Sequence, residues 1–498
     1  MNEPIVKSIH SDKIKKVTVS AFKWVSLLQV SYQSSLFIVN IVLARILISD
    51  DFGLASLVTV ITGVILTIVD MGFNAALIQK KETDKRDLST AFFINLVMAF
   101  VLTIALISSA SFIGSFFNKE ALVPMLRLFS FVFIIRAFIS VQMALCDRDL
   151  IFSKITQVTI ISYFVGSIVK IFMALKGYGS WSIIIGEIAT QIVMAMLFWI
   201  HSPFIPSIKL VNRESFNMLF SFGSKIMLTN LLNSLGHRID TMIVGKITSS
   251  ANLGVYSMSF AITSVIPSQI NAIIQRVMFP SFSRIQDDDT VTANMYLKLA
   301  RYISLISMPI AIGFIFVTPE FVRIFLTEKW VPAIPVIQIL CIFAMTNSLG
   351  GVLWSQILKA KGLSGMVLIM SVITLIALSL VVVIGSRWGL IGVAWAIVVY
   401  GWLFRFILQH IVNKIIKISM MEYIRSILPS FLTTLPMAVC LFAIRKIAKP
   451  IIINDLILFF VLLIIGAIIY ILSLRGFYKK DFMAFLSIVK SFYRRKNN

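Results

Sequence analysis

Residues 40–57 read NIVLARILISDDFGLASL, and residues 241–258 read TMIVGKITSSANLGVYSM. The two stretches align without a gap at an offset of 201 residues. The alignment pairs Arg45 with Lys246, Asp51 with Asn252, Gly53 with Gly254, and Ser56 with Ser257. In the flanking apolar segments, polar residues continue to meet polar residues. The pattern indicates an internal duplication of a helical block.

A second and weaker match pairs KGYGSWSIIIG (176–186) with SRWGLIGVAWA (386–396). Together the matches predict a six-helix block in 1–205 and another in 206–415. Two further helices and a basic tail occupy 416–498. Because each block holds an even number of spans, both copies face the same way. We therefore expect a pseudo-two-fold axis along the membrane normal.

The composition places the chain in a membrane. It is 58% hydrophobic and 13% charged, with a mean hydropathy of +0.95, whereas soluble proteins carry about 25% charged residues. So little charge cannot cover a water-facing surface, which excludes a soluble enzyme, a disordered chain and a secreted disulfide scaffold. We predict an all-α polytopic protein of about fourteen spans. The expected spans are 18–46, 52–79, 88–116, 121–145, 151–175, 179–201, 216–247, 251–279, 296–317, 333–358, 363–385, 389–410, 421–444 and 453–474.

The net charge of +23 follows the predicted topology. Lys and Arg gather in the even-numbered connections and in the tail, which places both termini in the cytoplasm. This distribution explains the positive charge without a nucleic-acid partner. The cysteines at 146, 341 and 440 are too far apart to indicate a metal site or a disulfide framework.

Polar residues recur at helical spacing within two spans of the duplicated blocks. They predict matched polar faces that line a central cavity between the lobes, with interhelical hydrogen bonding as the alternative. The seventh span carries Asn230, Asn233, Ser234, His237, Asp240 and Thr241, with Arg238 beside them, and the first span carries Ser26, Gln29, Gln33 and Asn40.

Cations outnumber acids inside the spans. A charge at the bilayer centre costs about 2.5–3.5 kcal/mol on insertion scales, so each needs a partner or a wet cavity. The surplus predicts a cavity that attracts an anionic head group such as a pyrophosphate. The residues expected to line this substrate cavity are Gln29, Gln33, Arg136, Lys225, Asn230, Asn233, His237 and Arg238.

Three acids lie well inside the spans, away from the span ends: Asp70, Glu187 and Asp240. They are candidates for carrying a coupling cation, which would be a proton or a sodium ion. Structural ion pairing is the alternative for Asp70, and Glu187 could equally form a gate or a simple ion pair.

Catalytic motifs are missing from the sequence. It contains no GxxxxGK[ST] loop, no GxSxG and no HExxH, and the expected external loops are too short to hold a catalytic centre. The chain is therefore expected to be a transporter rather than an enzyme, with neither a cofactor nor a metal.

Several blocks of sequence resemble a known family. They are FGLASLVTVITG (52–63), DMGFNAALIQ (70–79), DLSTAFFINL (87–96), FGSKIMLTNLLNSLGHRIDTMIVGK (222–246), LGVYSMSFAI (253–262), VMFPSFSRIQDD (277–288) and EKWVPAIPVIQIL (328–340). Together they look like the Wzx-type, colanic-acid-exporter-like polysaccharide flippases of the multidrug/oligosaccharidyl-lipid/polysaccharide transporter superfamily. The resemblance covers about residues 15–410; the last two helices match only in hydropathy.

The resemblance implies fourteen helices with two six-helix lobes facing a cavity. It also implies that undecaprenyl-pyrophosphate-linked oligosaccharide crosses a bacterial plasma membrane by alternating access coupled to a cation. Membrane lipids, a polysaccharide polymerase and export machinery are the further partners expected. Two alternatives are a multidrug efflux antiporter of the same superfamily and a lipid II flippase that differs only in cargo. Cations in the cavity and the added pair of helices argue against the antiporter.

Overall fold

The computed structural model describes residues 31, 33–80, 83–200, 202, 204–285, 287–351, 353–448 and 454–483. These residues form helices and connections and contain no strand. After a helical segment Gln33–Ile46 come α2 (Ser49–Val69), α3 (Phe73–Gln79), α4 (Lys85–Phe117), α5 (Leu122–Phe129), α6 (Phe131–Arg148), α7 (Phe152–Leu175), α8 (Ser180–Ile200), α9 (Arg213–Gly236), α10 (Ile239–Ile247), α11 (Ser250–Arg284), α12 (Asp289–Phe321), α13 (Ala333–Ser348), α14 (Leu353–Ala360), α15 (Ser364–Gly385), α16 (Gly389–Ile415), α17 (Met420–Ala448) and α18 (Asp455–Phe477). The short turns η1 (Ile208–Leu210), η2 (Val322–Leu326), η3 (Glu328–Trp330) and η4 (Ser386–Trp388) complete the order.

The helices have the length and composition of membrane spans. Within the described residues, nine helical stretches are long and apolar enough to cross a bilayer, and Gln33–Ile46 and Ala333–Asn347 are shorter apolar helices. The prediction of an all-α polytopic membrane protein is confirmed. The number fourteen and the two symmetric lobes stay predictions.

Four spans expected to be single helices are interrupted in the structure. The span 52–79 divides into α2 and α3, 121–145 into α5 and α6, 216–247 into α9 and α10, and 333–358 into α13 and α14. Hydropathy averaged over a whole span does not detect such breaks, because each involves only one to four residues within an apolar stretch. At the first break the backbone turns left-handed at Met71 and Gly72, and at the last Gly350 does the same.

The chain divides into two compact units. One comprises the chain up to Ser257 together with Ser371–Ser379, and the other comprises Met258–Met370 and the chain from Leu380. Helix α9 belongs to the first unit because it packs against α2, α3 and α4. The close approach of α3 and α9 depends on glycine, since a Cβ atom on Gly72 would lie 2.2 Å from the carbonyl oxygen of Gly223.

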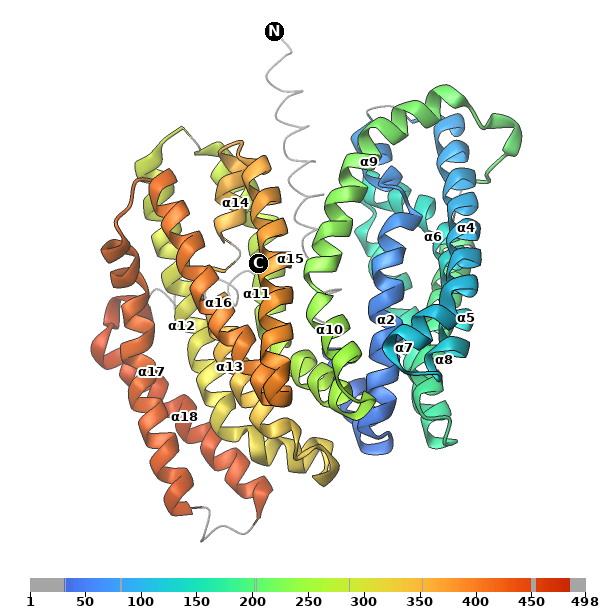
Figure 1. Ribbon diagram of the computed structural model, residues 1–498. Helices are drawn as coiled ribbons and strands as arrows, with labels where there is room; N and C mark the ends of the chain where they lie inside the picture. The colour runs from blue at the N-terminus through green and yellow to red at the C-terminus, as the bar shows by residue number, and fades with distance from the viewer. Residues whose placement is uncertain are drawn as a thin grey trace. The chain divides into compact units, whose positions relative to one another are not determined.

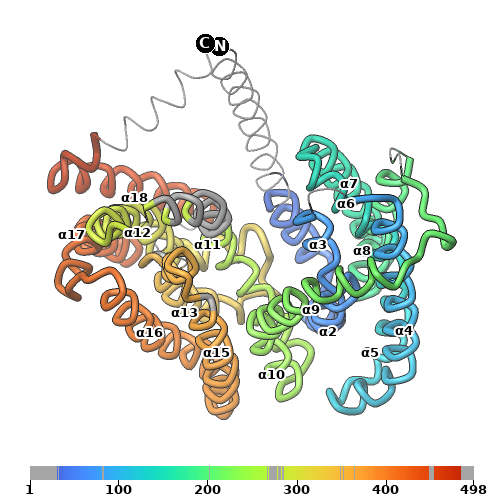
Figure 2. Tube along the Cα trace, turned by 90° about the horizontal axis from the view of Figure 1, so that it is seen from above, coloured from blue at the N-terminus to red at the C-terminus, as the bar shows by residue number. Residues whose placement is uncertain are grey.

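In the first unit, α7 and α8 form a closely packed pair, and α2 lies alongside α9 in both views (Figures 1 and 2). Two glycines let α7 and α8 approach each other. A Cβ on Gly166 would lie 1.8 Å from Oγ1 of Thr190, and a Cβ on Gly186 would lie 2.1 Å from Cγ of Lys170. Small residues at helix contacts are typical of membrane proteins, where close backbone packing replaces the hydrophobic effect.

In the second unit, α17 and α18 pack on α12 (Figure 1). Ion pairs reinforce this packing towards both ends of α12. Arg445 of α17 pairs with the fully buried Glu320 at 3.2 Å, while Arg301 pairs with Asp481, beyond the end of α18. The last two helices are therefore fixed to α12 by charge as well as by apolar contact.

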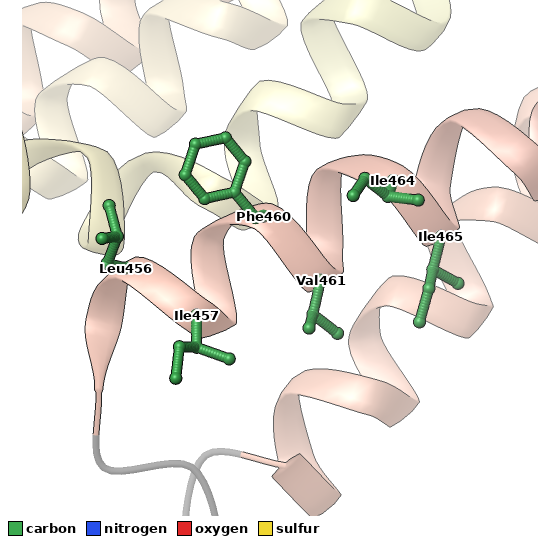
Figure 3. A pocket seen from close by; sticks show the side chains of 6 residues that line it. All are labelled: Leu456, Ile457, Phe460, Val461, Ile464 and Ile465. Atoms are coloured by element: carbon green, nitrogen blue, oxygen red, sulfur yellow. The ribbon is translucent and has the colours of Figure 1, made fainter.

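One face of α18 is apolar and open. Its side chains line a shallow hollow that exposes no polar surface (Figure 3), which suits contact with acyl chains. The lining residues are Leu456, Ile457, Phe460, Val461, Ile464 and Ile465.

Within the first unit, every second connection between helices lies at the same end of the helices, and these connections contact one another. The Asp51 carboxylate at the start of α2 accepts a hydrogen bond from the backbone N–H of Ser180 at 2.8 Å. Lys119, between α4 and α5, donates from Nζ to the carbonyl oxygens of Gly245 at 2.7 Å and Thr248 at 3.0 Å. Burial lowers the pKa of the Lys119 ammonium below its usual range, and nearby Lys246 lowers it further. These four connections are the odd-numbered ones of the predicted topology.

The even-numbered connections meet each other in the same way. In the first unit, Ser207 of the sixth connection donates its backbone N–H at 3.2 Å to Oγ of Ser89, which lies near the start of α4, just after the second connection. In the second unit, the Asp289 carboxylate pairs with Lys361 at 2.7 Å and with Lys417 at 2.8 Å. In the first unit, the odd-numbered and the even-numbered connections thus gather separately, as expected for helices that cross a membrane repeatedly.

Candidate transport site

Asp70 lies at the break between α2 and α3 and caps α2. Its carboxylate accepts hydrogen bonds from the backbone N–H of Gly72 at 3.1 Å and from Nδ2 of Asn74 at 3.2 Å. Arg136 of α6 lies close enough to act on the Asp70 charge. Neutral donors therefore hold the Asp70 carboxylate, and the Arg136 guanidinium is the cation that acts on it. Whether Asp70 forms an ion pair or carries a coupling cation stays a prediction.

A chain of polar side chains continues from Arg136 through α8 to α7. Arg136 Nη1 donates to Oε1 of Gln191 at 3.5 Å, and Nε2 of Gln191 donates to Glu187 at 3.0 Å. Glu187 in turn forms an ion pair with Lys170 at 2.9 Å. Glu187, an expected coupling residue, is thus connected through Gln191 to Arg136, an expected cavity residue.

Arg238 lies at the break between α9 and α10, where His237 ends α9 and Arg238 precedes α10. Its Nη1 donates to the carbonyl oxygen of Thr59 in α2 at 3.3 Å. The guanidinium rests against Gly63, because a Cβ there would lie 2.7 Å from its central carbon. The only hydrogen bond that the described residues give this guanidinium is the one to Thr59, so its other N–H groups can bind an anion.

Asp240 follows in the first turn of α10 and is 5% exposed. Its carboxylate accepts hydrogen bonds from the hydroxyl of Tyr256 at 2.5 Å and from Oγ1 of Thr241 at 3.4 Å. No Lys or Arg among the described residues forms an ion pair with it. A buried carboxyl held by neutral donors is free of a fixed counter-charge, unlike Glu187.

The remaining expected cavity residues lie mainly on α9. Lys225, Asn230, Asn233 and His237 are exposed there. Gln33 is half-buried in the helix before α2, and Gln29 lies outside the described residues. The polar face expected on one continuous seventh span therefore extends across a helix break.

Several partners of these residues were not identified from the sequence as site members. Gln191 could have been found, because it lies four residues after Glu187 on the same helix face. Lys170 is a cation within a span, and the sequence alone does not identify Glu187 as its partner. Tyr256 and Gly63 carry no local signal, because they reach Asp240 and Arg238 only after the chain has folded.

The second unit holds another buried cation, Arg405 of α16, which is 6% exposed. It donates to the carbonyl oxygen of Leu349, to Gln409 at 3.1 Å and to the Tyr296 hydroxyl at 3.5 Å. The Leu349 carbonyl lies where α13 ends and also accepts a hydrogen bond from Tyr423 at 2.7 Å. Because the carboxyl end of a helix is negative, Arg405 stabilises the break between α13 and α14.

The comparison with protein families decides the identity of the chain. Residues 42–335, more than half of its length, match the family model described as "Polysaccharide biosynthesis protein". The chain belongs to this family. The matched region includes α2 to α10, and hence Asp70, Arg136, Glu187, Arg238 and Asp240.

Curated relatives in this polysaccharide biosynthesis family extend over most of the chain. The lipopolysaccharide biosynthesis protein WzxC of Escherichia coli (strain K12) is 26% identical over 449 residues, covering 88% of this chain and 89% of its own. The teichuronic acid biosynthesis protein TuaB of Bacillus subtilis (strain 168) is 27% identical over 390 residues, covering 76% and 78% respectively.

Solved structures share the fold of this polysaccharide biosynthesis protein. The lipid II flippase MurJ in an inward closed conformation matches with a TM-score of 0.74 and 14% identity, over 93% of this chain and 99% of its own. A multidrug resistance MATE family transporter in an inward-facing conformation matches with a TM-score of 0.62 and 14% identity, over 79% and 99%. The fold is therefore that of polytopic transporters.

Proposed function

We propose that the chain is a flippase that moves undecaprenyl-pyrophosphate-linked oligosaccharide, a repeat unit of a surface polysaccharide, across the bacterial plasma membrane. Membership of the polysaccharide biosynthesis family over more than half of the chain carries the proposal. The transporter fold and the cations at Arg136 and Arg238 support it, because a pyrophosphate needs positive partners inside the membrane. The same cations disfavour an antiporter of cationic drugs.

Deleting the gene tests this function directly. We expect the cells to lose surface polysaccharide and to accumulate the lipid-linked repeat unit on the cytoplasmic side of the membrane. Expression of the full chain should reverse both effects. Normal polysaccharide combined with a new sensitivity to cationic drugs would instead identify a drug exporter.

The orientation belongs to the same proposal. Both termini lie in the cytoplasm, and the odd-numbered connections lie outside. The lysines of the even-numbered connections, such as Lys361 and Lys417 around Asp289, support this assignment because short cytoplasmic loops are enriched in Lys and Arg.

Transport is proposed to be coupled to a cation at Asp240. Of the three acids expected to serve this purpose, Glu187 already has a fixed counter-charge in Lys170, and Asp70 lies near Arg136. Asp240 is held by Tyr256 and Thr241, with His237 and Arg238 as the charged or titratable groups preceding it. A carboxyl without a cationic partner is the one that can exchange a proton or a sodium ion.

The coupling proposal predicts different behaviour for two conservative variants. In vesicles, we expect Asp240→Asn to remove the dependence of transport on the ion gradient, because the amide cannot carry the cation. Asp70→Asn is the matched control and should keep that dependence, because the Asn74 and Gly72 donors can still bond its amide oxygen. Loss of gradient dependence in Asp70→Asn alone would place the coupling at the α2–α3 break instead.

A further inference from the structure

The connection between α8 and α9 carries aliphatic side chains that the protein leaves uncovered. Ile205 is 80% exposed and Ile208 is 70% exposed, and the exposed Val211 follows after the same interval of three residues. The short turn η1 forms the middle of this connection. A single exposed aliphatic side chain is ordinary, but three on one short segment indicate a surface that contacts another molecule.

The fold aims these side chains outward, because the residue next to each of them is fixed to the first unit. Phe204 is buried in an apolar core. Ser207 donates its backbone N–H to Oγ of Ser89 at 3.2 Å, and Asn212 donates its backbone N–H to Oγ1 of Thr90 at 3.0 Å. The connection is therefore held against the start of α4, and the aliphatic side chains between these contacts cannot turn inward.

Exposed cations border the aliphatic side chains. Lys209 lies within η1, directly after Ile208, and Arg213 begins α9. The first turn of α4, which η1 contacts, adds Lys85 and Arg86. All four cations are exposed. The surface therefore combines aliphatic and positively charged groups.

The acids on the same two segments do not neutralise these cations. Asp87 is buried and pairs with Lys80. The exposed acids are Asp84, which caps α4, and Glu214, next to Arg213. Four exposed cations therefore face two exposed acids, and the surplus attracts an anion.

The backbone of the connection restricts the depth at which it can lie. Outside η1, residues 204–212 form no helix, and backbone groups without such pairing cannot lie among lipid acyl chains. At the surface of the membrane, water and head groups can bond them. Both α4 and α9 begin at this end of the first unit (Figure 1), which is the cytoplasmic end in the proposed orientation.

We propose that this connection binds anionic phospholipid in the cytoplasmic leaflet through Ile205, Ile208, Lys209, Val211 and Arg213, which we call the connecting strip. The aliphatic side chains insert at the level of the head groups, and the two cations bond phosphate oxygens. The composition favours lipid over a soluble protein, because the cores of protein interfaces are rich in aromatic residues and poor in lysine. The inference uses the proposed orientation but not the proposed cargo.

The connecting strip lies where the two repeated blocks are predicted to join, since the first is expected to end at residue 205 and the second to begin at 206. Bound lipid therefore holds at the membrane surface the segment that links the blocks. Helix α9 continues from this segment and packs against α2, α3 and α4.

Quenching by brominated lipid tests where the strip lies. In a full-length variant with alanine at the three native cysteines, Ile205→Cys carries a fluorescent dye. The purified protein is placed in vesicles of phosphatidylcholine and phosphatidylglycerol. We expect acyl chains brominated near the head group to remove most of the fluorescence, because the dye lies among them. A dye that brominated lipid does not quench would overturn the proposal.

The matched control is Asp287→Cys with the same dye. Asp287 is exposed in another even-numbered connection, where Asp288 and Asp289 follow it in place of aliphatic side chains, so its dye should stay bright. Equal quenching at both positions would overturn the proposal. A dye at position 205 that brominated lipid does not reach, and that is shielded from iodide only in native membranes, would indicate a protein partner instead.

Thermal unfolding in vesicles tests the charges. Phosphatidylglycerol should raise the Tm of the unaltered protein above its value in phosphatidylcholine alone. We expect Lys209→Gln/Arg213→Gln to lose most of that rise, and Lys209→Arg/Arg213→Lys to keep it. The matched control Lys479→Gln/Lys480→Gln removes two exposed cations after α18 and should also keep it. An undiminished rise in Lys209→Gln/Arg213→Gln would overturn the proposal. Neither measurement involves the oligosaccharide, so each result is independent of the proposed function.

Discussion

Arg238→Ala is expected to reduce export of the lipid-linked oligosaccharide by about 10- to 100-fold, the loss of one charge-assisted hydrogen bond of about 1.5–3 kcal/mol. The amount of protein in the membrane should not change. Among the described residues the guanidinium makes one hydrogen bond, to the carbonyl of Thr59, and otherwise rests against Gly63, so little stability depends on it. Export assays on membranes with matched protein levels would measure the effect. A fall in protein level instead would indicate a packing role.

Three further variants make this prediction specific. Arg127→Ala is the matched control, because Arg127 is also a cation in a span but is exposed and bonded to Ser111. It should leave export unchanged. Gly63→Ala should weaken export, since the new methyl group displaces the Arg238 guanidinium. The double variant Gly63→Ala/Arg238→Ala should be no worse than Arg238→Ala, because both changes act on one group.

Lys170→Met is expected to lower the free energy of unfolding by about 3–5 kcal/mol, because it leaves Glu187 inside the helix bundle without its cation. The side chains of Lys170 and Glu187 are 10% and 25% exposed, and Nζ of Lys170 lies 2.9 Å from Oε2 of Glu187. Replacing both partners, as in Lys170→Met/Glu187→Met, should recover most of the loss. Thermal unfolding of the purified protein in detergent would measure both variants.

An exposed ion pair provides the comparison. Arg323 and Glu328 lie 3.6 Å apart, and the Glu328 side chain is 77% exposed. We expect Glu328→Gln to change the free energy of unfolding by less than about 1 kcal/mol, since water screens such pairs. Equal losses in Lys170→Met and Glu328→Gln would contradict the assignment of a buried pair to Lys170 and Glu187.

The sequence predicted the fold class because hydropathy integrates over a whole span, and apolar stretches of that length are rare outside membrane proteins. It did not predict the helix breaks at Asp70–Gly72 and His237–Arg238. These breaks depend on a few backbone torsions and on contacts between neighbouring helices, such as that of α9 with α3. Amino-acid composition carries no information about either. The duplication was detectable because Gly53 and Gly254 are kept in register.

The candidate site was predictable in part for a similar reason. A charge in a span is conspicuous, so Asp70, Arg136, Glu187, Arg238 and Asp240 could be singled out from the sequence. Their partners are ordinary polar residues or glycines from distant segments. Which acid has a counter-charge, as Glu187 has in Lys170 and Asp240 lacks among the described residues, depends on tertiary structure alone.

The buried pair between Glu320 and Arg445 bears on biogenesis. The two residues are separated by 125 positions in the chain, so Glu320 leaves the ribosome well before the arginine that neutralises it. At about 5–20 residues per second, the delay is about 6–25 s. During that interval the Glu320 carboxylate must stay at the membrane surface or be protonated. Helix α12 can take its final position only after α17 has been inserted. A chain truncated after α16 would retain an orphan acid, and cellular proteases would be expected to remove it.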